Sequence, residues 1–221
     1  MLVRDRQYSR EDQDAYAVSS YRKANSAKKA NIFKDEIIPI EVKIKNEKML
    51  ISDDEEPDRV QYDKISKLKP AFVQNGTITA ANASKLNDGA SVVLIMSYSK
   101  AQELGLEPLA YVLEHVSCAH EPEWFTTAPR KAIQRVLRKS KMKHTDIDLW
   151  EINEAFSVVA MAAIDDLKIP PSKVNIYGGA VALGHPIGAS GARILTTLIH
   201  GMGKTSSNLG LASLCIGGGE A

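Results

Sequence analysis

Strand-like and helix-like segments alternate along the last hundred residues, and this pattern constrains the fold more than any other feature of the sequence. Helical apolar spacing is found over residues 129–142, 153–167 and 189–202. Short apolar runs typical of buried strands occupy residues 146–152, 173–179 and 209–215. This alternation predicts an α/β fold, in which helices cover a parallel or mixed sheet.

The first 120 residues are less regular. Ser9, followed three residues later by Asp12, predicts a capping-box-like start to a long helix. Residues 36–44 have the pattern of a strand, and Pro39 places that strand at a sheet edge because proline cannot donate a ladder hydrogen bond. The charged stretch 46–72 is expected to be an irregular loop region.

After residue 75 the composition changes to small residues that lead into apolar runs. Strands are expected over residues 90–96 and 108–119, with a short helix between them that ends at Gly105. With 221 residues, the chain is long enough for one large or two small domains.

The overall charge argues against a nucleic-acid or membrane partner. The formal net charge is +1, so no strong field favours polyanions. The basic cluster at 130–143 lacks interleaved aromatic residues and is interpreted as a solvated helix face. The longest uncharged run, 174–192, contains Pro186 and five glycines, which excludes a membrane span there. The two cysteines, far apart, indicate neither a disulfide framework nor a zinc site.

Three polar residues follow predicted strands, where ligands bind in sheets of this kind. Asn153 follows 146–152, His185 follows 173–179 within a glycine-rich loop, and Cys215 ends 209–215. We expect these three side chains to converge on one pocket.

The pattern around each of the three leaves alternatives open. His185 precedes a predicted helix start, whose partial positive charge favours a neutral imidazole able to accept a proton, although a loop histidine can also be purely structural. Cys215 precedes three glycines whose N–H groups can form an oxyanion nest, but a buried thiol can be a simple core residue. Asn153 could cap a helix or fix a water or substrate carbonyl.

Several motifs resemble those of the thiolase family. The segments "WEINEAF" (150–156), "NIYGGAVALGHPIGASGAR" (175–193) and "GLASLCIGGGEA" (210–221) look like its three C-terminal signature blocks, closest to the short-chain acetoacetyl-CoA type of mitochondrial members. "TITAANASKLNDGA" (77–90) and "SREDQDAYAVSSY" (9–21) are also similar. The resemblance implies a layered fold of helices on mixed five-stranded sheets, present only in part, plus a loop domain.

The resemblance also implies an activity. Thiolases of this type condense two acetyl-CoA molecules to acetoacetyl-CoA and CoA, or catalyse the reverse thiolysis, through an acetylated cysteine. By matching, His185 would activate that cysteine, Cys215 would take the α-proton of the second acetyl-CoA, Asn153 would hold an oxyanion-hole water, and the Gly217 N–H would serve the other oxyanion hole. An enolate needs a positioned base and donors already aimed at its oxygen, so the chemistry suits these groups.

The resemblance assigns further positions to substrate and ion binding. The coenzyme A thioester is substrate, and no tightly bound cofactor is implied. The positions that match coenzyme A contacts are Arg59, Val60, Gln61, Lys64, Ser84 and Phe156. The positions that match a potassium site are Tyr21, Ala80, Ala81, Ala83 and Val181.

Matching also divides the chain into three parts. Residues 1–77 would form a partial, coenzyme A-binding loop domain, 78–120 late strands of the N-terminal thiolase domain, and 121–221 the C-terminal domain without its final strand. The N-terminal half with the acylated cysteine is then expected to be missing. Cys118 does not match that cysteine, because its context "EHVSCAHEP" differs.

The missing cysteine and the family variants leave two other functions open. One is a degradative 3-ketoacyl-CoA thiolase, although such enzymes usually carry histidine at the position of Asn153. Ketoacyl synthases are more distant, because they lack the "CIGGG" block. The other is a non-catalytic fragment that binds coenzyme A. The resemblance further implies a homo-oligomer, tetramer or dimer, and favours the mitochondrial matrix over the cytoplasm.

Overall fold

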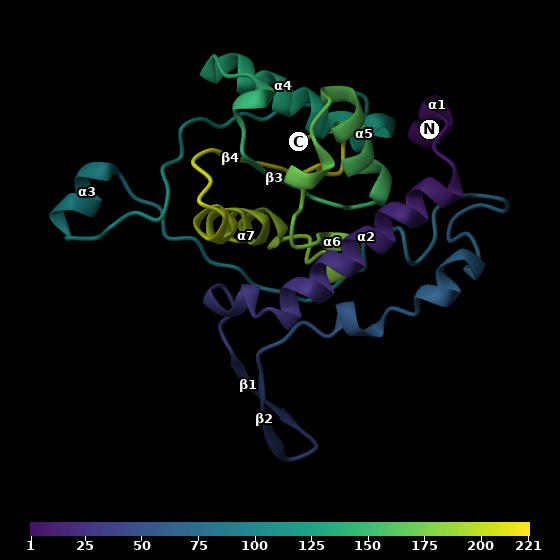
Figure 1. The fold of residues 1–221 in the computed structure, drawn as a ribbon, viewed down its shortest axis with the longest axis horizontal. Coiled ribbons are helices and arrows are strands. Elements are labelled where there is room, and N and C mark those ends of the chain that lie inside the picture. Colours follow the sequence, from purple (N-terminus) through teal and green to yellow (C-terminus); the bar gives the residue numbers. More distant parts are fainter.

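Two short parallel strands, β3 (Leu149–Ile152) and β4 (Gly210–Ser213), lie at the centre of the packed part of the molecule (Figure 1). The computed structural model describes residues 1–221. Helices α4 (Ala128–Ser140) and α5 (Ser157–Leu167) lie on one side of this sheet, and α7 (Ser190–Thr205) lies on the other. This arrangement confirms the predicted α/β fold, with helices layered on a sheet.

The main core is built where these elements meet. All of β3 is buried, and Trp150 and Ile152 have no exposed surface. Ile133 and Leu137 of α4 pack into the same cluster, as their helical spacing predicts. Burying side chains of this size contributes about 1.5–3 kcal/mol each, so this cluster holds the C-terminal part of the chain together.

Helix α2 (Arg10–Lys29) begins with the predicted capping box. The Ser9 hydroxyl accepts from the Asp12 N–H at 3.0 Å, and the Ser9 N–H donates to the Asp12 carboxylate at 2.8 Å. Both bonds satisfy groups that the first turn of a helix leaves without partners. The prediction is therefore confirmed.

Small residues on α2 allow the C-terminal part to pack closely against it. Ala17 and Ala24 of α2 form a second core cluster with residues of the short helix α6 (Ala180–Leu183). Gly178, with φ of 80°, approaches so closely that an added Cβ would lie 2.7 Å from the Ser20 carbonyl oxygen. This position therefore requires glycine.

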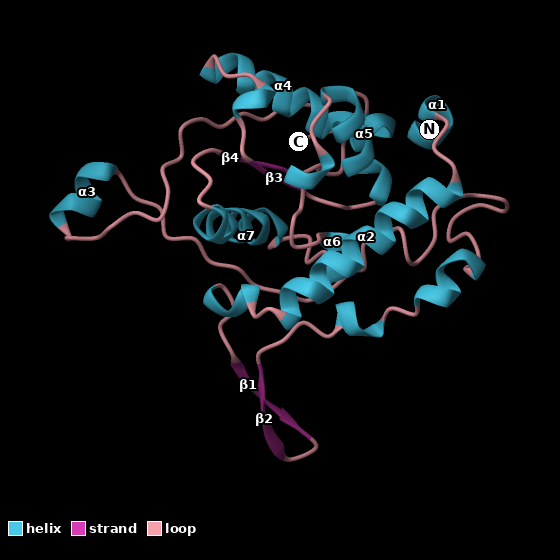
Figure 2. Ribbon diagram, in the orientation of Figure 1, coloured by secondary structure: helices cyan, strands magenta, loops and turns pink.

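Two parts project from the packed body (Figure 1). One is the hairpin of β1 (Ile40–Ile44) and β2 (Glu47–Ile51), which pair antiparallel. The other is α3 (Tyr98–Glu103), at the end of two long extended segments that are drawn as loops in Figure 2. The remaining short helices are α1 (Leu2–Arg6) and the 3₁₀ helices η1 (Ile32–Asp35), η2 (Glu56–Arg59), η3 (Tyr62–Lys67), η4 (Pro122–Thr127), η5 (His144–Asp146) and η6 (Pro171–Lys173).

Three of the predicted strands are wrong. Residues 90–96 pair with no other strand, and within 108–119 only the end pairs, where Ala119 forms an antiparallel bridge to Glu220. No neighbouring backbone lies beside the rest of these segments to complete a ladder. Within 173–179 only Val174 forms a bridge, to Trp150, before the chain turns at Asn175, which has a φ of 44°. A strand needs a partner as well as an apolar pattern.

Smaller differences concern element ends and short elements. The strand predicted over 36–44 begins only at Ile40, and β2 lies within the stretch expected to be irregular. Helix α5 begins at Ser157 rather than at residue 153. None of the helices is both long enough and apolar enough to cross a lipid bilayer.

Candidate active site

Asn153 and His185 meet at the carboxyl end of the central sheet. The side-chain amide nitrogen of Asn153 lies 3.3 Å from Nε2 of His185. Asn153 follows β3 directly, and its backbone N–H donates to the carbonyl of Ser213, the last residue of β4, at 2.9 Å. The sequence-based expectation that these loop residues converge is therefore met for this pair.

The second ring nitrogen of His185 fixes the tautomer. Nδ1 lies 2.5 Å from the Ser190 hydroxyl oxygen, and that hydroxyl donates to the Pro186 carbonyl at 2.9 Å. Because the hydroxyl proton is used on Pro186, the oxygen accepts from Nδ1–H. The Asn153 amide nitrogen is only a donor, so Nε2 carries the lone pair. This places a proton-accepting nitrogen beside Asn153.

The surroundings keep this imidazole neutral. The pKa of His185 is lowered from its ordinary value by burial and then by the charge of Arg193. Ser190 is also the first residue of α7, where the partial positive charge of a helix N-terminus opposes an imidazolium. A neutral imidazole with a free lone pair at Nε2 is a general base.

The backbone around His185 is held from the other side by residues 85–87. The His185 N–H donates to the Lys85 carbonyl at 2.9 Å, and Leu86 forms a parallel bridge with His185. Gly184, with φ of 96°, lies against Asn87, whose Oδ1 would be 2.3 Å from an added Cβ. The glycine before the histidine therefore serves a close approach, which the glycine-rich pattern predicts in general terms.

Cys215 lies two residues beyond β4, beside the strand that leads to Asn153. Its side chain is buried, and burial raises the pKa of the thiol to about 11. A thiol with this pKa stays protonated and suits proton transfer better than nucleophilic attack. Cys215 lies beyond the end of the strand next to β3 and makes no hydrogen bond to His185 or Asn153.

Gly217 lies in a tight turn that Ile216 and Glu220 close by an antiparallel bridge. Its N–H takes part in no backbone hydrogen bond, so it is available to a ligand. Gly219, by contrast, is needed for packing, since a Cβ there would lie 2.3 Å from the His120 carbonyl oxygen.

The predicted coenzyme A contacts fall into two places. Arg59, Val60, Gln61 and Lys64 lie on or between η2 and η3. Ser84 lies beside Phe156, because Ser84 Oγ donates to the Ala155 carbonyl at 2.9 Å and Ala83 bridges to Phe156.

Arg59 does not offer an unpaired charge. Its guanidinium donates to Glu55 at 2.5 Å and to Glu56 at 2.8 Å. Lys64 makes no ion pair and is exposed. Of the two predicted cations, Lys64 is therefore the one free to meet a phosphate.

A shallow groove of about 430 Å³ between α2 and the η2–η3 segment adds residues that the sequence analysis missed. Val60 lines it, together with Arg22, Ser26 and Lys29 of α2. These three follow each other at spacings of four and three residues, which places them on one helix face. This spacing could have indicated a shared face in the sequence. It was missed because α2 is polar along much of its length and these residues belong to no recognisable motif.

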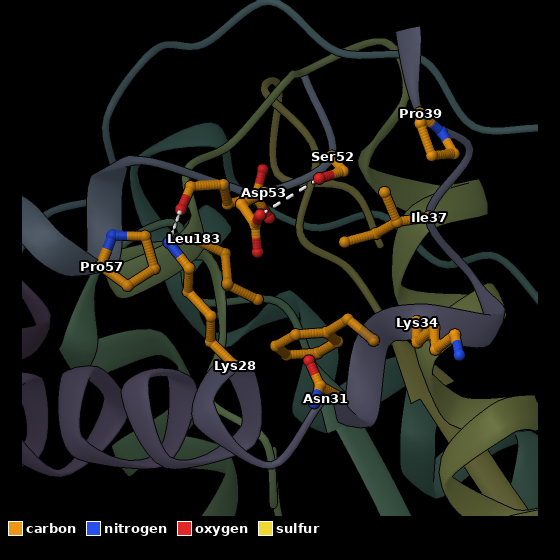
Figure 3. Close-up of a pocket in the computed structure, with 11 residues that line it drawn as sticks. Lys28, Asn31, Lys34, Ile37, Pro39, Ser52, Asp53, Pro57 and Leu183 are labelled. Carbon is orange, nitrogen blue, oxygen red and sulfur yellow. Dashed lines mark hydrogen bonds between the residues drawn. The ribbon is translucent and has the colours of Figure 1, made fainter. Parts of the chain in front are cut away.

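Two other hollows lie away from the His185–Asn153 pair. One of about 180 Å³, shown in Figure 3, lies between the end of α2, η1 and the base of the hairpin, and Lys28 and Leu183 contribute to its wall. The other, of about 950 Å³, is mostly apolar and lies between residues 108–116, α4, α7 and β4. Neither contains a predicted site residue.

The residues predicted to hold potassium fit an ion only in part. The carbonyl oxygens of Ala80, Ala81 and Ala83 accept no backbone hydrogen bond, so they could face a cation. Tyr21 and Val181 pack in one cluster. The Tyr21 hydroxyl oxygen, however, accepts from the ammonium of Lys85, so a cationic group already stands at this ligand. The donor set does not fit a second cation there.

Comparison with known proteins identifies the family. The family model of the thiolase N-terminal domain matches residues 1–99, and that of the thiolase C-terminal domain matches residues 106–221. The acetyl-CoA acetyltransferase of Schizosaccharomyces pombe is 44% identical over 223 residues, covering 100% of this chain and 56% of that protein. The acetyl-CoA acetyltransferase of Yarrowia lipolytica is 49% identical over 213 residues, with 96% of this chain and 53% of that protein covered.

Solved structures agree with this assignment. The Bacillus anthracis acetyl-CoA acetyltransferase superimposes with a TM-score of 0.95 at 41% identity, covering 99% of this chain and 56% of that one. The Acat5 thiolase of Ascaris suum, crystallised with coenzyme A, gives 0.90 at 45%, and human mitochondrial 3-ketoacyl-CoA thiolase gives 0.91 at 34%, with the same coverage. The chain belongs to the thiolase family. It spans about half the length of the curated relatives it matches.

Proposed function

We propose that this chain takes part in acyl transfer between coenzyme A thioesters, as an acetyl-CoA C-acetyltransferase. The reaction condenses two acetyl-CoA molecules to acetoacetyl-CoA and CoA, or runs in reverse as thiolysis. The observation that carries the proposal is the neutral His185 imidazole, held by Ser190 and Asn153 with its Nε2 lone pair at the carboxyl end of the sheet. Similarity to acetyl-CoA acetyltransferases over the whole chain supports it.

Each site residue has a role in this proposal. His185 Nε2 takes the proton of the cysteine thiol that becomes acetylated. No cysteine among these 221 residues matches that cysteine of the family. When the first acetyl group moves to that cysteine, the departing CoA thiolate takes the proton of the Cys215 thiol. The Cys215 thiolate formed in this way then removes the α-proton of the second acetyl-CoA, which restores the thiol. The Gly217 N–H and a water on Asn153 stabilise the oxyanions, since donors fixed in advance favour the charge that develops.

The groove between α2 and the η2–η3 segment is proposed as the place of the coenzyme A nucleotide. Arg22 and Lys29 line the groove and supply positive charge for its phosphates, and Lys64 of η3 adds a further exposed charge. Ser84 and Phe156 border the path of the thioester arm. The crystal structure of the Ascaris suum relative in complex with coenzyme A supports coenzyme A binding. No tightly bound cofactor is proposed, and no step uses potassium.

Proton exchange tests the proposal without requiring the acetylated cysteine. In D₂O, the chain should exchange the α-protons of acetyl-CoA at a rate that rises with pH, because the base is the small thiolate fraction of Cys215, whose pKa is about 11. Mass spectrometry measures the exchange. Cys215→Ser should abolish the exchange, and Cys118→Ser, the matched control, should retain it. Coenzyme A binding is measured beside it by calorimetry, and should persist in both variants.

The outcomes separate the candidate functions. Binding without exchange in the unchanged chain would favour a non-catalytic coenzyme A-binding chain. Tighter binding of a long 3-ketoacyl-CoA than of acetoacetyl-CoA, measured by calorimetry, would favour a degradative 3-ketoacyl-CoA thiolase, a candidate kept because of the 34% identical human structure. Absence of binding would contradict the proposal.

We further propose that the protein assembles as a homo-oligomer, dimer or tetramer, and that it works in the mitochondrial matrix, with the cytoplasm as the alternative. The likeness of its motifs to mitochondrial thiolases supports both. Light scattering after size exclusion would contradict the first by finding a monomer. Fractionation of cells that express the protein would contradict the second by finding it outside mitochondria.

A further inference from the structure

Lys85 joins three separate parts of the chain through its side chain. Its ammonium donates a hydrogen bond to the Tyr21 hydroxyl of α2 and lies 5.0 Å from the centre of that ring, within the range of a cation–π contact. It also lies 3.4 Å from the carboxylate of Glu56 in η2. About a third of the Lys85 side chain is exposed and Tyr21 is buried, so the contact is partly shielded from water.

The backbone of the same residue holds the candidate base. The Lys85 carbonyl accepts the His185 N–H at 2.9 Å, and the following residue forms the bridge to His185. Movement of the Lys85 backbone would therefore move the peptide group of His185. The ammonium therefore links this backbone both to α2, through Tyr21, and to η2, through Glu56.

The surroundings of the ammonium are those of a monovalent cation. They are the Tyr21 hydroxyl, the face of the Tyr21 ring and the Glu56 carboxylate. A lysine ammonium and a potassium ion carry the same charge and prefer the same oxygen partners. Two such charges at one partly buried hydroxyl would repel each other strongly.

We propose that the ammonium of Lys85 takes the place of a bound monovalent cation and acts as a built-in positioning residue for the His185 loop. The inference concerns the architecture of the site and does not depend on which reaction the site performs. It replaces the potassium site implied by the family resemblance, because the covalently attached charge makes the ion unnecessary.

The test compares unfolding in potassium chloride and sodium chloride at equal ionic strength. The unchanged chain is expected to unfold at the same temperature in both salts. Lys85→Thr vacates the Tyr21 hydroxyl, so potassium should raise its unfolding temperature over sodium by about 2–4 °C or more. Lys67→Thr, at an exposed lysine of η3 that makes no ion pair, is the matched control and should behave like the unchanged chain.

Amide hydrogen exchange adds a readout that a general loss of stability would not reproduce. In Lys85→Thr the peptide that contains His185 should lose protection in sodium and regain it in potassium, while peptides of α4 should not respond to the salt. Adding Tyr21→Phe to Lys85→Thr should remove the potassium response, because the hydroxyl oxygen is the proposed ligand.

Two results would overturn the inference. One is a potassium-specific stabilisation of the unchanged chain, which would show that the ion binds while Lys85 is present. The other is an equal response of Lys85→Thr to both salts. A variant that folds only in potassium would support the inference. If it folds in neither salt, Lys85→Ala, which also vacates the Tyr21 hydroxyl, is judged by the same two criteria.

Discussion

Residues 86–117 and residues 147–215 both contain apolar runs of strand length, but only the second region buries them. Leu149 of β3 is 3% exposed, whereas Leu94 is 78% exposed in a segment that pairs with nothing. β3 has β4 beside it and helices over both faces, and the segment around Leu94 has neither. The comparison shows that an apolar pattern gives a segment the capacity to be a strand, and a neighbouring backbone decides whether it becomes one.

The packed region should depend most strongly on the buried carboxylate of Glu154. It accepts hydrogen bonds from the Tyr16 and Ser20 hydroxyls, the Asn175 amide and the Val181 N–H, at 2.7 to 3.1 Å. Glu154→Ala leaves these donors buried without an acceptor, so we expect a loss of about 3–5 kcal/mol in the free energy of unfolding. Denaturant titration measures it.

Glu123→Ala is the control for this carboxylate, because Glu123 is exposed and forms no ion pair. It should change stability by less than about 0.5 kcal/mol. A loss below about 1 kcal/mol in Glu154→Ala would mean that water satisfies the four donors and that this site does not hold α2 and α6 together.

The next largest effect compares the same substitution in the two regions. Leu149→Ala opens a cavity beneath α7 and should cost about 2–5 kcal/mol. Leu94→Ala removes a side chain that is already exposed and should change stability by no more than about 0.5 kcal/mol. Equal losses would show that residues 90–96 are buried in solution, which denaturant titration of both variants decides.

The smallest expected effect is a change in the pH dependence of stability. Burial raises the pKa of Glu151 to about 8, and burial also raises that of Glu36 to about 7. A carboxyl with a raised pKa binds a proton in the folded state that the unfolded chain has lost. Stability should therefore fall as pH rises from the unfolded value, near 4.5, and level off above pH 8.

Between pH 7 and 8 the decrease in the free energy of unfolding is due mainly to Glu151. One proton accounts for no more than about 1.4 kcal/mol per pH unit. Glu151→Gln should flatten that part of the curve and roughly halve the slope between pH 4.5 and 7, where Glu36 contributes the other half. Unfolding measured at half-unit pH steps gives both slopes. An unchanged slope above pH 7 in the variant would place the titration elsewhere.

Much of the packed region could be predicted from the sequence because its signals are local. The capping box of Ser9 and Asp12, the apolar face of α4 and the strand before Asn153 depend on neighbouring residues alone. Asn153 follows β3 as predicted and meets His185, but the strand expected before His185 does not form, and this residue is placed by α6 and by its bridge to Leu86. The coenzyme A contacts at Gln61 and Lys64 and the roles of Cys215 and Gly217 stay predictions.

What the sequence could not show are contacts between distant segments. The strand predicted over residues 90–96 does not form. The residue pattern of a segment does not show whether another strand lies beside it. The Lys85–Tyr21 contact joins positions 64 residues apart and could not be read from a small-residue motif. Likewise Arg59 matched a phosphate-binding position, yet Glu55 and Glu56 occupy its guanidinium.

The state of the His185 ring tests the account most directly. Nitrogen-detected NMR of the labelled chain should show a neutral ring at pH 7 with its proton on Nδ1, and a pKa below the ordinary value of 6.5. Ser190→Ala should weaken the preference for that tautomer, because Nδ1–H loses its acceptor. A ring protonated on Nε2, or a pKa above 6.5, would leave no lone pair facing Asn153 and would contradict the assignment of His185 as the base.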